Sequence, residues 1–307
     1  MQAFRTLLLP LLMIVLSGCR PAAQEDFTAR PIPSPTAEPP VLRVYLTDED
    51  TLSAMPLDAY LTGVVAGEMP NTWPLEALKA QAILARTYVL KFIAEKDSKY
   101  PGADISTDVA EAQAYNASAV NDRIRQAVTE TAGLILLTRE GDLPWPWFHS
   151  HSGGMTETAQ DGIDWHGDEP AYTRIAQGME ADSAAWSAEF TQEEFIAACR
   201  STGAEVTSAQ SVRVAQKGKS GRAVTLTADG VTVNAARLRI SLGSTKMRST
   251  LLTELSAKGG TIRMSGRGFG HGVGLSQWGA KALAEQGWSA EKIALHYYKG
   301  LQVVKAW

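Results

Sequence analysis

The sequence has too few cysteines for a disulfide framework and too little positive charge for a nucleic-acid binder. Cys19 and Cys199 are the two cysteines among 307 residues, so an internal network of disulfides is excluded. Lys and Arg number 29 against 33 Asp and Glu, a formal net charge of −4. Proteins that hold the phosphates of nucleic acids are usually basic, so we expect no nucleic-acid partner.

Long hydrophobic runs are also missing, because no apolar stretch reaches the ~18 residues that a membrane-spanning helix needs. The rest of the composition is that of a folded protein, with 45% hydrophobic and 20% charged residues. A chain of roughly 300 residues can bury about three quarters of the surface that its unfolded form exposes. We therefore expect one or two folded lobes with a sizeable core.

The first residues have the pattern of a secretory signal. Arg5 precedes an apolar stretch at 7–16, about ten residues that are too few to span a bilayer. The sequence LSGC follows at 16–19 and resembles the lipobox of bacterial lipoproteins. The resemblance implies that residues 1–18 are a signal peptide and that Cys19 is acylated. We expect an extracytoplasmic lipoprotein with a membrane anchor; the alternative is an ordinary signal peptide with a chance cysteine.

Residues 19–40 are expected to form a tether. The stretch 20–40 holds six of the 14 prolines and almost no large apolar side chains, so it cannot bury enough surface to fold. The folded domain is expected to begin near Val41 and to run to Trp307.

The folded part shows helical and β-type patterns in separate stretches, which favours an α+β fold class. Helices are expected at 56–65, 71–92 (capped by Asn71 or Thr72), 124–132, 191–199, 277–286 and 290–299. Strands are expected at 41–46, in a hairpin of 134–138 with 145–149, and in four runs within 212–242, SVRVA, AVTLTA, VTVNA and RLRIS. The last group predicts a smaller β-rich lobe at about 205–245. Arg86, at the edge of the apolar stripe of the long helix, is expected to form a structural ion pair.

Several familiar cofactor motifs are absent. The glycine run at 266–274 never places glycines at i, i+2 and i+5, so the dinucleotide fingerprint fails. His149 and His151 offer two metal ligands, but no third ligand follows at the usual spacing. We therefore expect no organic cofactor and no metal.

Four segments spread along the folded part carry a family resemblance. They are VVAGEMP at 64–70 with its continuation to Tyr88, the Asp-rich stretch 104–115, FHSHSGGMT at 148–156, and GFGHGVGLSQWGA at 268–280 with HYY at 296–298. Together they resemble the SpoIID/LytB family of cell-wall lytic enzymes. The likeness covers nearly all of 41–307.

The resemblance implies a lytic transglycosylase that cleaves peptidoglycan glycan strands, with strands stripped of peptides preferred. Glu68, in the Gly-Glu-Met-Pro motif, would be the catalytic acid and base. Part of the family's naming also suggests a cell-wall amidase as partner. Some relatives hold zinc with Cys and His near the Ser-Gly-Gly loop, but Cys199 lies far from that loop in this sequence.

The residues around Glu68 are compatible with this role, although by themselves they favour a surface position, and the resemblance reverses that preference. A Glu acts as a general acid near neutral pH when its pKa is raised. Glu68 follows a short helix, whose terminal carbonyls disfavour a nearby carboxylate, and Met69 and Trp73 add apolar neighbours that desolvate it. The alternative is a surface Glu in a turn between two helices.

Two loops are expected to bind substrate. In an extended chain the alternating glycines at 266–274 would share one face, which a sugar ring or another backbone can approach closely. Ser276 and Gln277 then begin a helix with free N–H groups. For the glycine run, the alternative is tight packing of a central strand. For Ser152, Gly153 and Gly154, the alternative is a simple turn. For His271, it is a position in the core. The candidate substrate-binding residues are Ser152, Gly153, Gly154, Thr156, His271, Gly272, Ser276 and Gln277.

Two other functions stay open. One is a non-catalytic wall-binding protein that enhances an amidase. The other is a glycan hydrolase in which Glu68 works with a second carboxylate at a defined separation. The candidates for that carboxylate are Asp104, Asp108, Asp161 and Asp164.

Overall fold

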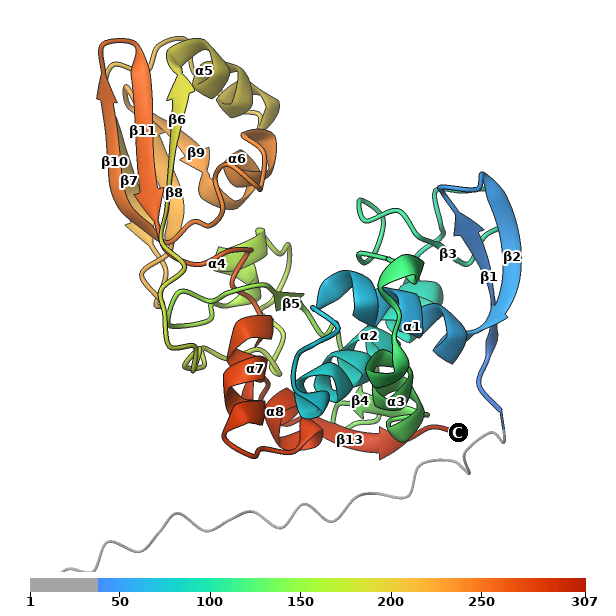
Figure 1. The fold of residues 1–307 in the computed structure, drawn as a ribbon. Coiled ribbons are helices and arrows are strands. Elements are labelled where there is room, and N and C mark those ends of the chain that lie inside the picture. Colours follow the sequence, from blue (N-terminus) through green and yellow to red (C-terminus); the bar gives the residue numbers. More distant parts are fainter. Residues whose placement is uncertain (1–37) are drawn as a thin grey trace, which may run out of the picture. The chain divides into compact units, whose positions relative to one another are not determined.

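The computed structural model describes residues 38–307, which belong to one compact unit (Figure 1). The predicted signal peptide, its lipobox and most of the tether lie outside the described residues. Within 38–307, the short strands form small separate sheets, and helices lie between them in the sequence. The predicted α+β class is therefore confirmed. No helix in this part is long and apolar enough to cross a membrane.

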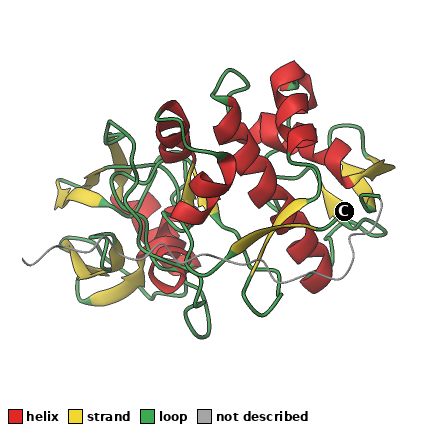
Figure 2. Cartoon of the chain, turned by 90° about the horizontal axis from the view of Figure 1, so that it is seen from below, coloured by secondary structure: helices red, strands yellow, loops and turns green. Residues whose placement is uncertain are grey.

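Five helices build the first hydrophobic core (Figure 2). The central helix α2 packs against the other four. These helices are α1 (Leu57–Glu68), α2 (Leu75–Glu95), α3 (Asp122–Glu130), α7 (Gln277–Glu285) and α8 (Ala290–His296). All five were predicted as helices, α2 from the 3–4 spacing of its apolar residues.

The beginning of α2 differs from the prediction. Its N-cap residue is Pro74, which makes no side-chain cap, and the Asn71 side chain donates to the carbonyl of Ala119 over 2.7 Å. Capping by Asn71 or Thr72 was therefore wrong. Pro74 holds φ at −53°, close to the helical value, which prepares the turn without a capping side chain.

The structural ion pair expected of Arg86 is confirmed. The side chain is fully buried in the first core, and its Nε donates to Asp58 Oδ1 over 2.9 Å. Its Nη1 also donates to the carbonyl of Leu134 over 3.0 Å. Arg86 therefore holds together α1, α2 and the strand that begins at Leu134.

Small sheets flank this core, and one of them corrects a prediction. The strands are β1 (Val41–Leu46), β2 (Thr51–Pro56), β3 (Ile105–Ser106), β4 (Leu134–Leu137), β5 (Phe148–His149), β12 (Leu275–Ser276) and β13 (Gln302–Lys305). The sheet orders are β2-β1-β3, β13-β4 and β12-β5.

The predicted hairpin of 134–138 with 145–149 does not form. A turn closes where it was expected, with the Gly141 N–H donating to the Thr138 carbonyl over 3.1 Å. Pro144 and Pro146 follow, and proline has no N–H to donate to a ladder. Strand β4 pairs with β13 instead, and β5 pairs in parallel with β12.

A second hydrophobic core lies within the β-rich part of the chain. Its sheets have the orders β10-β11-β6 and β7-β8-β9, and helices α5 and α6 complete it. The elements are β6 (Trp186–Thr191), α5 (Gln192–Ser201), β7 (Val212–Lys217), β8 (Ala223–Ala228), β9 (Val231–Asn234), α6 (Ala235–Ser241), β10 (Leu252–Lys258) and β11 (Thr261–Gly266).

The expected strand RLRIS is helix α6. The Asn234 side chain accepts a hydrogen bond from the Arg237 N–H and so caps the helix. The β-branched run before it ends at Asn234, and the cap turns the chain at that point. The short helices η1 (Ala117–Ala119) and α4 (Ala159–Ile163) were not predicted.

Candidate active site

The carboxyl group of Glu68 is held by two hydrogen bonds from distant parts of the chain. Glu68 is the last residue of α1 and is half-buried. Its Oε1 accepts from the Ala114 N–H over 2.7 Å, and its Oε2 accepts from Gln277 Nε2 over 3.1 Å. The structure therefore brings together two predicted site residues that are 209 positions apart.

The surroundings of Glu68 favour its protonated form. Burial raises the pKa of this carboxyl, and the hydrogen bonds from Ala114 and Gln277 oppose the rise without cancelling it. The position at the C-terminal end of α1 acts in the same direction as burial. The group can therefore keep a proton to a higher pH than an exposed Glu and release it to a substrate.

Aromatic side chains stand next to this pair. Trp278 directly follows Gln277 and is 39% exposed, so its ring is open to a ligand. It contacts Trp73 edge to face, with ring centroids 4.9 Å apart, and lies 6.4 Å from the His151 ring. An aromatic face of this kind offers an apolar surface against which a sugar ring can pack.

Glu180 is a site residue that the sequence did not reveal. Its side chain is 2% exposed, and its Oε1 accepts from the Ser152 N–H over 2.7 Å and from Ser152 Oγ over 2.6 Å. It also accepts from Ser276 Oγ over 3.1 Å, and Ser276 caps the helix that Gln277 begins. Glu180 thus joins the two predicted loops, one of which leads directly into Gln277. It lies in a stretch without regular periodicity, which gave no signal.

The glycine run adopts a conformation that differs from the prediction. Gly268, Gly270, Gly272 and Gly274 have φ angles of 82°, 112°, 85° and 70°, which belong to the left-handed region rather than to an extended strand. A Cβ atom on Gly274 would lie 1.9 Å from the Trp147 carbonyl oxygen. The expectation that these glycines line one face of an extended chain is therefore wrong.

These glycines serve close packing within the protein. A Cβ atom on Gly272 would lie 2.3 Å from Nε of the buried Arg222, and one on Gly268 would lie 2.8 Å from the His151 carbonyl oxygen. The loop is thus packed against the segment at 147–153. A substrate contact by Gly272 stays a prediction that its surroundings do not favour.

The other predicted binding residues differ in exposure. Ser152 and Thr156 are buried, and Thr156 Oγ1 donates to the Arg174 carbonyl over 3.0 Å. Gly153 is buried as well, and its N–H donates to His151 Nδ1 over 3.0 Å, whereas Gly154 is exposed. Of this loop, Gly154 is the predicted residue most open to a ligand.

Three of the four carboxylates considered as partners for Glu68 form ion pairs elsewhere. Asp104 pairs with Arg43 over 2.5 Å, and Asp108 pairs with Lys99 over 2.6 Å, which lowers the pKa of Asp108 to about 2. Asp164 pairs with Arg237, and the pKa of Asp161 is raised by burial. Among the hydrogen bonds described for residues 38–307, none joins any of these four groups to Glu68.

The histidines near the Ser-Gly-Gly loop do not form a zinc site of the Cys/His type. His149 Nδ1 lies 3.1 Å from the Val273 carbonyl oxygen, and Cys199 is buried in the second core. In the described part of the chain, no group of three or more His, Cys, Asp or Glu side chains is arranged to hold a metal ion. The residues present do not fit the zinc of those relatives.

Two family models match parts of the sequence that contribute to this site. A family model described as stage II sporulation protein, SpoIID, matches residues 45–137, which include Glu68. A second model, described as a domain of unknown function, matches residues 175–274, which include Glu180 and the glycine run.

Similar proteins extend this match over most of the chain. Stage II sporulation protein D of Bacillus subtilis (strain 168) is 30% identical over 286 residues, 88% of this chain and 80% of that protein. The protein of the same name from Bacillus amyloliquefaciens is 31% identical over 290 residues, 89% of this chain and 81% of that protein. The amidase enhancer of B. subtilis is 27% identical over 292 residues, which cover 78% of this chain and 39% of that protein. The chain belongs to the stage II sporulation protein D family, a family associated with the cell wall.

Proposed function

We propose that the protein is a lytic transglycosylase that cleaves the glycan strands of peptidoglycan, with Glu68 as general acid and then general base. The observation that supports this proposal is the Glu68 carboxyl, with a raised pKa and with hydrogen bonds from Ala114 and Gln277. Membership of a cell-wall family supports the same substrate class.

The reaction needs one carboxyl group. Protonated Glu68 gives its proton to the glycosidic oxygen as the bond from that oxygen to C1 of a muramic acid breaks. The carboxylate then takes the proton of the same sugar's 6-hydroxyl, whose oxygen bonds to C1. This internal hydroxyl has a large effective concentration, so it can react faster than water. Glu68 ends protonated, as it began, and no water is consumed.

The two hydrogen bonds to Glu68 fit its second task. The N–H of Ala114 and the amide of Gln277 both donate to the carboxyl, so they stabilise its charged form. That form exists between the two proton transfers. Burial favours the acid before bond cleavage, and the two donors favour the carboxylate after it.

The products decide between cleavage mechanisms. Glycan strands first stripped of peptides are incubated with the protein, and the fragments are analysed by mass spectrometry. We expect 1,6-anhydro-muramic ends, each lighter than a hydrolysed reducing end by one water. Reducing ends alone would instead establish a hydrolase.

A second candidate function rests on the similarity to the amidase enhancer of B. subtilis. In that case the protein binds the wall and accelerates a separate amidase, and Glu68 is dispensable. Binding to strands without cleavage, together with a faster amidase reaction, would favour this function over the transglycosylase.

We also propose that the protein is held at a membrane by acylation of Cys19, outside the cytoplasm. The LSGC motif after a short apolar stretch supports this placement. Cys19→Ala is expected to leave the protein unprocessed or to release it from the membrane fraction, measured by its mass and by fractionation. A Cys199→Ala variant is the matched control. Normal processing and membrane association of Cys19→Ala would contradict the anchor.

A further inference from the structure

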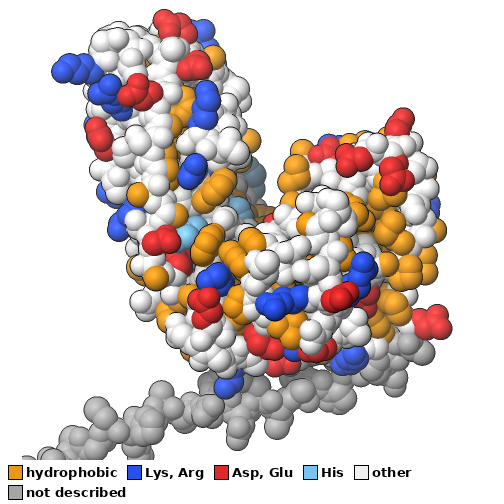
Figure 3. Space-filling view, viewed as in Figure 1, with side chains coloured by type: hydrophobic (Ala, Val, Ile, Leu, Met, Phe, Trp, Pro, Cys, Tyr) orange, Lys and Arg blue, Asp and Glu red, His pale blue; other side chains and the backbone are white. Residues whose placement is uncertain are grey.

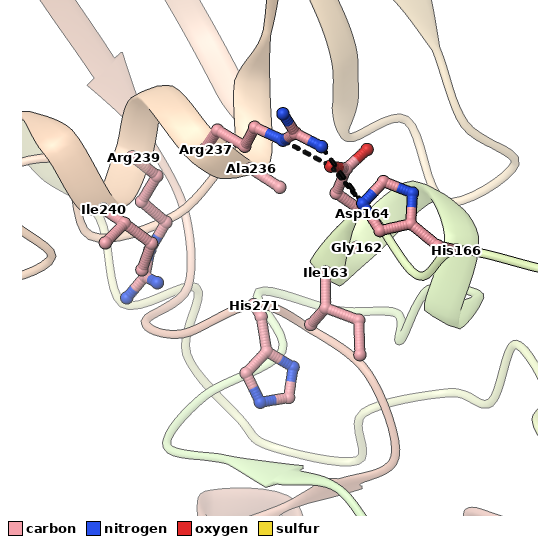
Figure 4. Close-up of a pocket in the computed structure, with 9 residues that line it drawn as sticks. All are labelled: Gly162, Ile163, Asp164, His166, Ala236, Arg237, Arg239, Ile240 and His271. Carbon is pink, nitrogen blue, oxygen red and sulfur yellow. Dashed lines mark hydrogen bonds and ion pairs between the residues drawn. The ribbon is translucent and has the colours of Figure 1, made fainter. Parts of the chain in front are cut away.

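A cavity of about 460 Å³ lies where α4 meets α6 and the glycine run (Figure 4). Arg237 and Arg239 come from α6, and Asp164 follows α4. His271 of the glycine run forms another part of the wall. Among the hydrogen bonds described for residues 38–307, none joins these residues to Glu68. The cavity is therefore separate from the candidate active site.

The charges around the cavity do not cancel. Arg237 Nε donates to Asp164 Oδ2 over 2.5 Å, so these two charges compensate each other. Arg239 is 7% exposed, and its Nε donates to the Arg248 carbonyl over 3.0 Å. Among the ion pairs described for residues 38–307, none includes Arg239. One positive charge in the wall is therefore left without a carboxylate.

Burial and neighbouring groups make the uncompensated charge of Arg239 costly. Burial lowers the pKa of Arg239 to about 10, so the group stays charged at neutral pH at a cost in solvation. Arg222 is fully buried nearby, and its Nε and Nη1 have no hydrogen-bond partner among the described residues. Burial and then these two arginines lower the pKa of His271 to about 3, so its ring is neutral. The carboxylates of Glu157 and Glu180 offset part of the charge of Arg222, so Arg239 is the group that an anion in the cavity would stabilise most.

The walls also limit what kind of anion fits. Ile163 and Ile240 also line the cavity, with Ile240 beside Arg239 on α6 and Ile163 beside His271 (Figure 4). A small apolar group joined to a carboxylate would meet both surfaces at once, because guanidinium groups bind carboxylates in a planar, two-pronged geometry. The lactyl ether of muramic acid has this composition, a methyl group and a carboxylate, when no peptide is attached.

The cavity lies within reach of the candidate active site. His271 precedes Gln277 by six positions, and six residues of chain span at most about 20 Å. A glycan of a few sugar rings can cover such a distance. The distance between His271 and Gln277 is therefore within the length of one short strand.

We propose that the cavity between α4 and α6 binds the lactyl carboxylate of an unsubstituted N-acetylmuramic acid, with Arg239 as its charged partner. The inference rests on the proposed glycan substrate and gives it a specificity, since a stem peptide converts this carboxylate into a neutral amide. Strands without peptides are then preferred because their carboxylates are free.

Binding of small sugars tests the proposal without any cleavage. The protein is titrated with N-acetylmuramic acid, N-acetylglucosamine, lactate and inorganic phosphate, and binding is followed by nuclear magnetic resonance. We expect saturable binding of N-acetylmuramic acid, and binding of N-acetylglucosamine at least tenfold weaker because it lacks the carboxylate. Arg239→Gln should weaken the binding of N-acetylmuramic acid about 10- to 100-fold, the range for a hydrogen bond between charged groups. Arg213→Gln, an exposed arginine outside the cavity, should leave it unchanged.

Two further variants distinguish a loss of binding from a folding defect. Ile240 is 66% exposed at the cavity, so Ile240→Glu adds a negative charge without disturbing the core. It should weaken binding about threefold to tenfold at low salt, while Ile240→Gln has little effect. Equal binding of both sugars, binding of phosphate as tight as that of N-acetylmuramic acid, or no loss in Arg239→Gln and Ile240→Glu would each overturn the proposal.

Glu68→Gln separates this proposal from the proposed function. That variant should bind N-acetylmuramic acid like the wild type, because the cavity does not include Glu68. Binding that persists while the wild type cleaves no strands would contradict the transglycosylase and support the cavity. Cleavage by the wild type without Arg239-dependent binding would support the transglycosylase and contradict the binding of muramic acid in the cavity.

Discussion

Glu68→Gln is expected to reduce strand cleavage by about 10²–10⁴-fold, the effect typical of losing a general acid–base group. The amide keeps the shape of the side chain and can still accept from Ala114, but it has no proton to give at neutral pH. The rate is measured as anhydro ends released from peptide-free strands per unit time. The wild-type rate should fall as pH rises through the raised pKa of Glu68, because the acid form is then lost.

The control for this loss is the fold of the variant. A group whose pKa is raised by folding contributes its stability below its ordinary pKa, here 4.5, and loses it as pH rises through the folded value. The unfolding temperature of Glu68→Gln relative to wild type should therefore be higher at pH 7 than at pH 4. Glu140→Gln, an exposed residue in the 138–142 turn, should change neither property. Activity of a folded Glu68→Gln within threefold of wild type would remove Glu68 from the mechanism.

Local patterns allowed much of the first core to be predicted. The apolar spacing of α2 and the terminal glycines of α7 and α8 are signals contained within one element. Gly287, with a φ angle of 83°, directly follows the C-cap of α7 as predicted, whereas α8 ends at His296, four residues before Gly300 and earlier than expected. The hairpin at 134–149 failed because two prolines stop its second strand, and the true partner of β4 lies at the C-terminal end of the chain.

The site was predictable where it rests on a motif and unpredictable where it rests on long-range contacts. Glu68 and Gln277 lie in recognisable motifs, and the structure joins them. Glu180 stands in an irregular segment, so only tertiary packing shows that it accepts from both Ser152 and Ser276. The surface in Figure 3 mixes acidic and basic side chains, in keeping with the net charge of −4, and composition could not point to Arg239, which is buried and has no ion pair among those described for residues 38–307.

The second large effect is expected for Glu180→Ala. This change removes the acceptor of three hydrogen bonds, from the Ser152 N–H, Ser152 Oγ and Ser276 Oγ, in a place that is 2% exposed. Each buried donor left without a partner costs about 1–3 kcal/mol. We expect the free energy of unfolding to fall by about 3–5 kcal/mol, measured by urea denaturation.

Glu180→Ala should also reduce activity. Ser276 caps helix α7, Gln277 is the first residue of that helix, and Gln277 donates a hydrogen bond to Glu68. Glu180→Gln keeps the volume and one carbonyl acceptor, so it should lie between Glu180→Ala and wild type in both properties. The exposed Glu205 gives the control, Glu205→Ala, for which neither property should change. A double-mutant cycle of Glu180→Ala with Ser152→Ala should show a coupling of about 1–3 kcal/mol, since both changes remove the hydrogen bond from Ser152 Oγ to Glu180. Additive losses would mean that this hydrogen bond does not hold the loop. Unchanged activity of Glu180→Ala would break the link from Glu180 to Glu68.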